Sequence, residues 1–108
     1  MISKELLSEV LKKEVVKIKG IENNTLIYGC KVHDGWYDEI NIYELAHKCK
    51  EWAIKIDYKI ESHIHLINKK FICVASFCTK DNTTKFFQEH TEPEAIFKAC
   101  EWIMERTK

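Results

Sequence analysis

Two histidines, His63 and His65, have the spacing best suited to binding a metal ion in this chain. Side chains two positions apart on a β-strand lie on the same face, so both imidazoles would face one ion. Imidazole is a common ligand of zinc and other transition metals. A third ligand is needed, and His33 or Glu61 would supply it if their strands are neighbours. The alternative, which we favour, is that the two histidines belong to a polar strand face in contact with water.

The five cysteines do not have the spacing of a zinc site. Structural zinc sites use close cysteine pairs separated by two to four residues, with a second pair further along. Cys73 and Cys78 are five positions apart on one expected strand and so point to opposite faces. Cys30, Cys49 and Cys100 lie among apolar residues. We therefore predict that the cysteines are free thiols that behave as small buried hydrophobic residues.

The segment Asp34-Gly35-Trp36-Tyr37-Asp38 is the best candidate for a binding site. It places two large aromatic residues between a glycine and acids, outside the regular elements, and such residues often dominate binding energy at interfaces. The binding hypothesis rests on Asp34, Trp36, Tyr37 and Asp38. The competing interpretation, which the pattern favours slightly, is that Trp36 folds back and closes one end of the core.

Recognisable catalytic motifs are missing from the sequence. It has no G-x-S-x-G and no phosphate-binding loop. The acid pair Asp38-Glu39 lies in an ordinary polar loop. We predict a protein without a cofactor that acts by binding another macromolecule. The alternative is a metal-dependent enzyme that uses His63, His65 and His33.

Length and charge narrow the class of protein. The chain has 108 residues, 45% of them hydrophobic and 31% charged, which predicts one globular domain spanning 1–108. Lysine and arginine total 17, as do aspartate and glutamate, so net charge gives no general attraction to nucleic acid or to anionic membranes. No apolar run approaches the length of a membrane span, and the first residues do not resemble a signal peptide. We expect a cytoplasmic protein.

The spacing of apolar residues predicts the regular elements. We expect helices at 3–14, 42–56 and 92–106, and strands at 15–20, 25–33, 57–66, 71–79 and 84–89, with a loop at 33–39. Asn41 and Thr91 are expected to cap the second and third helices. Strand 71–79 is apolar on both faces, which suggests helices on both faces of a sheet. The predicted class is α+β: a mainly antiparallel sheet of four to five strands with three helices packed on it, in the order α-β-β-α-β-β-(β)-α.

The last two helices resemble each other at an offset of 50 residues. Lys48, Glu51 and Trp52 correspond to Lys98, Glu101 and Trp102. This echo indicates either a duplicated hairpin–helix unit or the convergence of capped amphipathic helices, and we favour convergence because the strands share no identities. In either case Trp52 and Trp102 are expected to anchor the core.

Binding of duplex RNA is a third interpretation. A helix followed by three strands and a helix is the order of the double-stranded-RNA-binding domain. That family has a lysine-rich cluster at the start of its last helix, whereas this chain has Thr91-Glu92-Pro93-Glu94. The predicted helix at 42–56 also interrupts the strands. We therefore expect no nucleic-acid partner.

The stretch from His90 to Cys100, HTEPEAIFKAC, resembles the closing helix of small phage and prophage proteins described as the phage αβα-sandwich domain. A mid-chain helix like Ile42-Tyr43-Glu44-Leu45-Ala46 precedes the strand pair in those proteins, so the resemblance covers roughly residues 40–106. It implies an accessory protein of a mobile element, with a host or phage protein as partner, and it carries over no catalytic residue. A homodimer through Phe86-Phe87 or through an exposed strand edge is also open.

Overall fold

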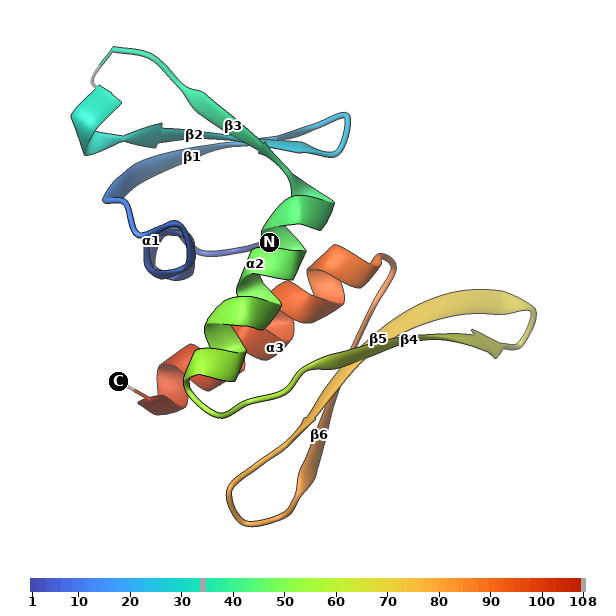
Figure 1. The fold of residues 1–108 in the computed structure, drawn as a ribbon. Helices are drawn as coiled ribbons and strands as arrows, with labels where there is room; N and C mark the ends of the chain where they lie inside the picture. Colours follow the sequence, from blue (N-terminus) through green and yellow to red (C-terminus); the bar gives the residue numbers. More distant parts are fainter. Residues whose placement is uncertain (34, 108) are drawn as a thin grey trace.

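The computed structural model describes residues 1–33 and 35–107. Within them the chain forms three α-helices, one short 3-10 helix and six strands (Figure 1). Their bounds, in chain order, are α1 Lys4–Leu11, β1 Val15–Glu22, β2 Thr25–Cys30, η1 Lys31–His33, β3 Asp38–Asn41, α2 Ile42–Lys55, β4 Glu61–Ile67, β5 Lys70–Cys78, β6 Thr84–Glu89 and α3 Glu92–Thr107.

The described strands form two separate antiparallel sheets, each of three consecutive strands: β1-β2-β3 and β4-β5-β6. The α+β class and the antiparallel pairing are thus confirmed, but the prediction of one sheet of four to five strands is wrong. The missed element is β3. Its four residues include Asp38 and Glu39, two acids that were expected to lie in a loop. In the structure β3 pairs with β2, with Asp38 opposite Tyr28.

Both sheets begin with the same tight hairpin. Asn23 and Asn24 connect β1 to β2, and Asn68 and Lys69 connect β4 to β5. All four residues have positive φ, which is the geometry of the two-residue turn that suits the twist of paired strands. Strand β1 therefore ends at Glu22, two residues beyond the strand predicted at 15–20.

Helix α3 is the centre of the molecule. It packs across α2 on one side and against the sheet β4-β5-β6 on the other, while α1 and α2 cover β1-β2-β3 (Figure 1). The predicted cap Asn41 accepts hydrogen bonds from the amides of Tyr43 and Glu44. Where α2 and α3 cross, the Sγ of Cys100 lies 3.6 Å from the carbonyl oxygen of Cys49. One continuous hydrophobic core joins the three helices to both sheets.

The second sheet is covered on one face. Ala75, Phe77 and Phe87 face α3, and Phe87 stacks on Phe77 with ring centroids 6.0 Å apart. Among the described residues, no helix packs on the opposite face of this sheet. The expectation that helices cover both of its faces is therefore wrong. Val74 explains the misleading pattern. It is buried on the open face, where its neighbours across the sheet are His63 and Gln88.

The order of elements repeats. After α1, the described chain runs strand-strand-strand-helix twice, as β1-β2-β3-α2 and β4-β5-β6-α3. Trp52 and Trp102 lie at matching places on the two helices, and both are partly buried against the core. The repeated arrangement therefore consists of three strands and a helix, one strand more than the hairpin and helix expected from the similarity at an offset of 50 residues. Within residues 1–33 and 35–107, none of the helices combines the length and apolarity that crossing a bilayer requires.

Candidate functional site

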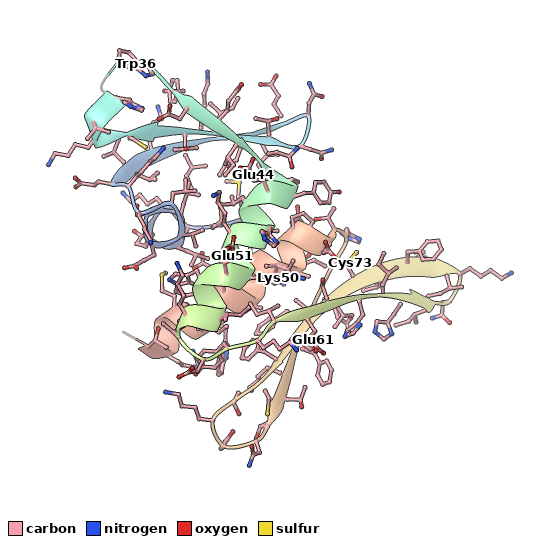
Figure 2. The ribbon with its side chains drawn as sticks, viewed as in Figure 1. Trp36, Glu44, Lys50, Glu51, Glu61 and Cys73 are labelled. Carbon is pink, nitrogen blue, oxygen red and sulfur yellow. The ribbon has the colours of Figure 1, made fainter. Side chains whose placement is uncertain are left out.

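Trp36 stands at the end of the first sheet, away from the helices (Figure 2). Its amide donates a hydrogen bond to the carbonyl oxygen of His33 over 3.2 Å. Its ring stacks on the His33 imidazole, with centroids 5.7 Å apart and planes inclined by 25°. Even so, 63% of Trp36 is exposed. The interpretation that Trp36 folds back to close the core is therefore wrong.

His33 is held from its other side by Asp38. Its Nδ1 lies 2.6 Å from Oδ2 of Asp38, the first residue of β3. The hydrogen bond with His33 holds the pKa of the Asp38 carboxyl below its ordinary value. Burial raises the pKa of Tyr28 and of Cys30, and the negative charge of Asp38 raises them further. The hydrogen bond with Asp38 thus fixes the orientation of the His33 imidazole that stacks on the Trp36 ring.

Tyr37 lies flat against the strand next to this pair. A Cβ atom added to Gly29 would lie 3.7 Å from two atoms of the Tyr37 ring, so the ring packs on bare backbone. Lys19 of β1 places its Nζ 5.0 Å from the ring centroid, a cation–π distance. The residue remains 44% exposed. A Cβ at position 29 would make ordinary van der Waals contact with the ring, so an alanine would also fit there.

Together His33, Trp36, Tyr37 and Asp38 form what we call the aromatic site. It borders a pocket of about 230 Å³. The pocket is lined by Val16, Lys17, Gly29, Cys30, His33, Gly35, Trp36 and Tyr37. Its walls are aromatic and apolar with lysine at the edge, which suits an apolar side chain of a partner better than a reacting group. Of the four residues in the binding hypothesis, Trp36, Tyr37 and Asp38 are brought together here, and Asp34 lies outside the described residues.

The structure does not assemble the three histidines of the metal hypothesis. His63 and His65 share the open face of β4, with ring centroids 6.1 Å apart. His33 belongs to the aromatic site on the other sheet. Across residues 1–33 and 35–107, no group of three histidine, cysteine, aspartate or glutamate side chains is placed to hold a metal ion. Of the three histidines in the hypothesis, the described structure therefore brings only His63 and His65 together.

One hollow of the described structure was missed in the sequence. It holds about 500 Å³ between α1, the first sheet and α2, where Glu44 and Glu51 lie along the helix (Figure 2). Its floor is Val10, Leu11, Tyr28, Ile40 and Trp52, and its rim is Glu9, Lys12, Lys13, Glu39, Glu44, Lys48, Glu51 and Lys55. Four lysines and four glutamates leave the rim without net charge. Each of these residues looks in sequence like the solvated margin of an amphipathic element, so no signal marked the groove.

A second missed hollow surrounds Trp102. Arg106 lies over the Trp102 ring at 4.2 Å from its centroid, and Lys85 approaches it at 5.5 Å. The hollow holds about 480 Å³ and also includes Tyr58, Lys80 and Asp81. The Asp81 carboxylate is hydrogen-bonded to Thr79 and Thr83 within its own turn, which lowers its pKa. Arg106 and Lys85 already contact the Trp102 ring, and this contact explains their positions without a bound ligand.

Comparisons of the chain with protein-family models, with curated proteins and with solved structures find no match.

Proposed function

We propose that this chain is a non-enzymatic accessory protein, of the kind found in phages and prophages, that acts in the cytoplasm by binding another protein through its aromatic site. The observation that carries the proposal is the exposed Trp36 ring on an ordered support. Exposed tryptophans are enriched among the residues that contribute most to binding, and they bury a large area when a partner covers them.

The support is what distinguishes Trp36 from an ordinary exposed aromatic residue. Stacking on His33, and the hydrogen bond from His33 to Asp38, hold the ring in place before any partner arrives. A side chain that is already ordered loses less conformational entropy on binding, and this raises affinity without any new contact. Tyr37 extends the same surface.

The partner is expected to offer an apolar side chain flanked by acids. The pocket beside Trp36 is of a size to admit one such side chain, and Lys17 stands at its edge. Lys19 holds Tyr37 through its ring face and adds a second positive charge on the same strand. A negatively charged flank would be attracted to both lysines, which favours correct orientation of the encounter.

The alternative of a metal-dependent enzyme has less support. His33 is engaged with Asp38 and lies in η1 beside the first sheet, whereas His63 and His65 lie on the second sheet. Elemental analysis of untagged protein and thermal shifts with zinc, manganese or nickel test this alternative. A metal bound by a single copy, together with hydrolytic activity that His63→Gln abolishes, would favour it.

For the duplex-RNA alternative, the order of elements is favourable and the charge at the start of α3 is unfavourable. The described order α2-β4-β5-β6-α3 contains a helix, three strands and a helix, although α2 does separate these strands from β1-β2-β3, as expected. At the start of α3, however, Glu92 accepts a hydrogen bond from Ser62 at 2.9 Å. An acid at this place repels phosphate. We expect no retention of duplex RNA even at low salt, and salt-sensitive retention would contradict the protein-binding proposal.

A pull-down from bacterial lysate with and without phage infection, followed by cross-linking and mass spectrometry, tests the proposal. The double variant Trp36→Ala/Tyr37→Ala should lose the captured protein, and cross-links in the wild type should map near β1 and β3. The matched control is Tyr43→Ala/Phe86→Ala, which removes two other exposed aromatic residues and should retain it. Full retention by the Trp36 and Tyr37 variant would overturn the proposal.

A further inference from the structure

Strand β4 is an edge strand without the features that usually protect one. Exposed edges are normally blunted by charges, bulges or shortness. Strand β4 pairs with β5 over seven residues without a register shift, and in the described ranges no strand pairs with its other edge. Glu61, at its start, is its only aspartate, glutamate, lysine or arginine. Six of its seven residues are exposed.

The other three sheet edges are protected. Strand β1 has two register shifts and carries Lys17 and Lys19. Strand β3 has only four residues. Strand β6 carries Lys85 and Glu89, and Glu89 is paired with Lys98 of α3 at 2.7 Å. The contrast singles out β4 as the edge open to another strand.

The β4–β5 hairpin also exposes an apolar surface. Ser62 faces α3, where it hydrogen-bonds Glu92, so Ile64 and Leu66 lie on the same face further along the strand. Opposite them, Phe71 pairs with Leu66. These three residues lie beyond the cover of α3 and are 68%, 64% and 71% exposed. Figure 1 shows the hairpin projecting from the rest of the molecule.

The sequence of β4 is complementary to itself in antiparallel orientation. A twofold axis at Ile64, the middle of Glu61–Ile67, pairs all seven residues with their counterparts. Ile64 then meets Ile64, and Leu66 meets Ser62, which covers apolar surface on the face toward α3, in the part of the strand that the helix does not reach. On the open face, each His63 lies opposite the His65 of the other copy. No pair of like formal charges is brought together.

We infer that two copies of this chain associate through antiparallel pairing of β4, and that their four imidazoles from His63 and His65 then form a binding site for a zinc ion. The pairing joins the two second sheets into one of six strands through an isologous contact. It satisfies the free edge and covers Ile64 and Leu66 of both copies.

The site is complete only in the dimer. Directly opposite residues of an antiparallel pair have Cβ atoms about 5 Å apart, and His63 and His65 of one copy already have ring centroids 6.1 Å apart. Four imidazoles on one face therefore lie within the reach of a single ion or of two ions bridging the strands. Zinc binds neutral imidazole nitrogen at about 2.0–2.1 Å, most often with four ligands. The inference concerns the second sheet, so it is independent of the partner proposed for the aromatic site.

The test measures the dimer dissociation constant of the full chain, without a histidine tag, by sedimentation over a concentration series with EDTA or with zinc. The wild type should form dimers, and zinc should lower the dissociation constant by about tenfold or more. Ile64→Lys places a charge in the middle of the edge and should give a monomer under both conditions. Its control is Ile54→Lys, the same change at an exposed site on α2, which should leave dimerisation unchanged.

The histidines are tested separately. His63→Gln/His65→Gln should still dimerise with EDTA present but should no longer respond to zinc, whereas His47→Gln on α2 should respond like the wild type. A wild type that stays monomeric with and without zinc overturns the inference, as does a dimer that survives Ile64→Lys. Dimerisation with no response to zinc overturns the four-histidine site. Circular dichroism of each variant verifies that it is folded.

Discussion

Asp38 is the residue on which the aromatic site depends. It begins β3, pairs with Tyr28 across the sheet, and hydrogen-bonds the imidazole that supports Trp36. From the sequence, Asp38 was expected to be part of a binding loop, with no structural role. Its function as a support follows from the pairing of β3 with β2, a contact between residues ten positions apart that no local pattern announced.

Replacing Asp38 with Asn should destabilise the protein in a pH-dependent way. Because the hydrogen bond with His33 lowers the folded-state pKa of Asp38 below its ordinary 3.8, the carboxylate contributes stability above that pH and loses it as pH falls through the folded value. The difference in free energy of unfolding between wild type and Asp38→Asn should therefore be largest near neutrality and shrink below about pH 4. Urea unfolding across pH measures it. Glu39→Gln, an exposed neighbour, serves as the control, and a difference that stays constant with pH would contradict the assignment.

The cysteines show how far a residue-level rule reaches. The prediction of buried thiols is confirmed for Cys30, Cys49 and Cys100. It is wrong for Cys78, which is exposed, and only partly right for Cys73. Both exceptions lie on β5: Cys78 is on the open face with Val74, and Cys73 is on the face of Ala75 and Phe77 but nearer the exposed Phe71. Apolar neighbours in sequence identify a buried position only where another element covers the strand, and that cover is a tertiary fact.

At the scale of elements, the sequence predicts the helices and hairpins correctly. It does not predict that the strands divide into two sheets. Helix caps depend on adjacent residues, so Asn41 was found. The two hairpin turns depend on residues that tolerate positive φ, of which Asn23, Asn24 and Asn68 are good examples. Lys69 is not one of these, and it occupies the same backbone conformation as Asn24.

This difference predicts a stabilising substitution. A side chain with a Cβ in the left-handed region costs about 1–2 kcal/mol, and glycine avoids most of that cost but has a more flexible unfolded state. Lys69→Gly should raise the free energy of unfolding by about 0.5–1 kcal/mol. Asn24→Gly should gain less, because asparagine already tolerates this conformation. Urea unfolding of both variants at one pH compares them, and a loss of stability in Lys69→Gly would show that the side chain makes a contact worth more than the backbone strain.

At the scale of the molecule, repetition and asymmetry coexist. Each half is a three-stranded sheet followed by a helix, but α1 is present only before the first half. The radius of gyration, 14.4 Å, exceeds the roughly 13 Å typical of a compact chain of this length. The projecting β4–β5 hairpin accounts for an excess of this kind. The spacing of residues in the sequence predicted the polar histidine face of β4. The surface that α3 leaves uncovered could not be predicted, because it depends on how the two halves pack together.

The continuous core between the halves predicts that they unfold together. Trp52 borders the first sheet, where it lines a groove with Tyr28 and Ile40, and Trp102 contacts Phe77 of the second, with ring centroids 5.4 Å apart. Trp36→Phe/Trp102→Phe leaves Trp52 as the reporter of the first half, and Trp36→Phe/Trp52→Phe leaves Trp102 as the reporter of the second. Within each variant, the urea midpoint from fluorescence should coincide with that from far-ultraviolet circular dichroism, since α2 and α3 cannot separate without exposing core residues of both halves. Comparing two probes on the same variant removes the effect of any loss of stability caused by the substitutions. If Trp102 reports a transition at lower urea than circular dichroism does, the second sheet unfolds on its own, and the crossing of α2 and α3 is then a contact between two independent units.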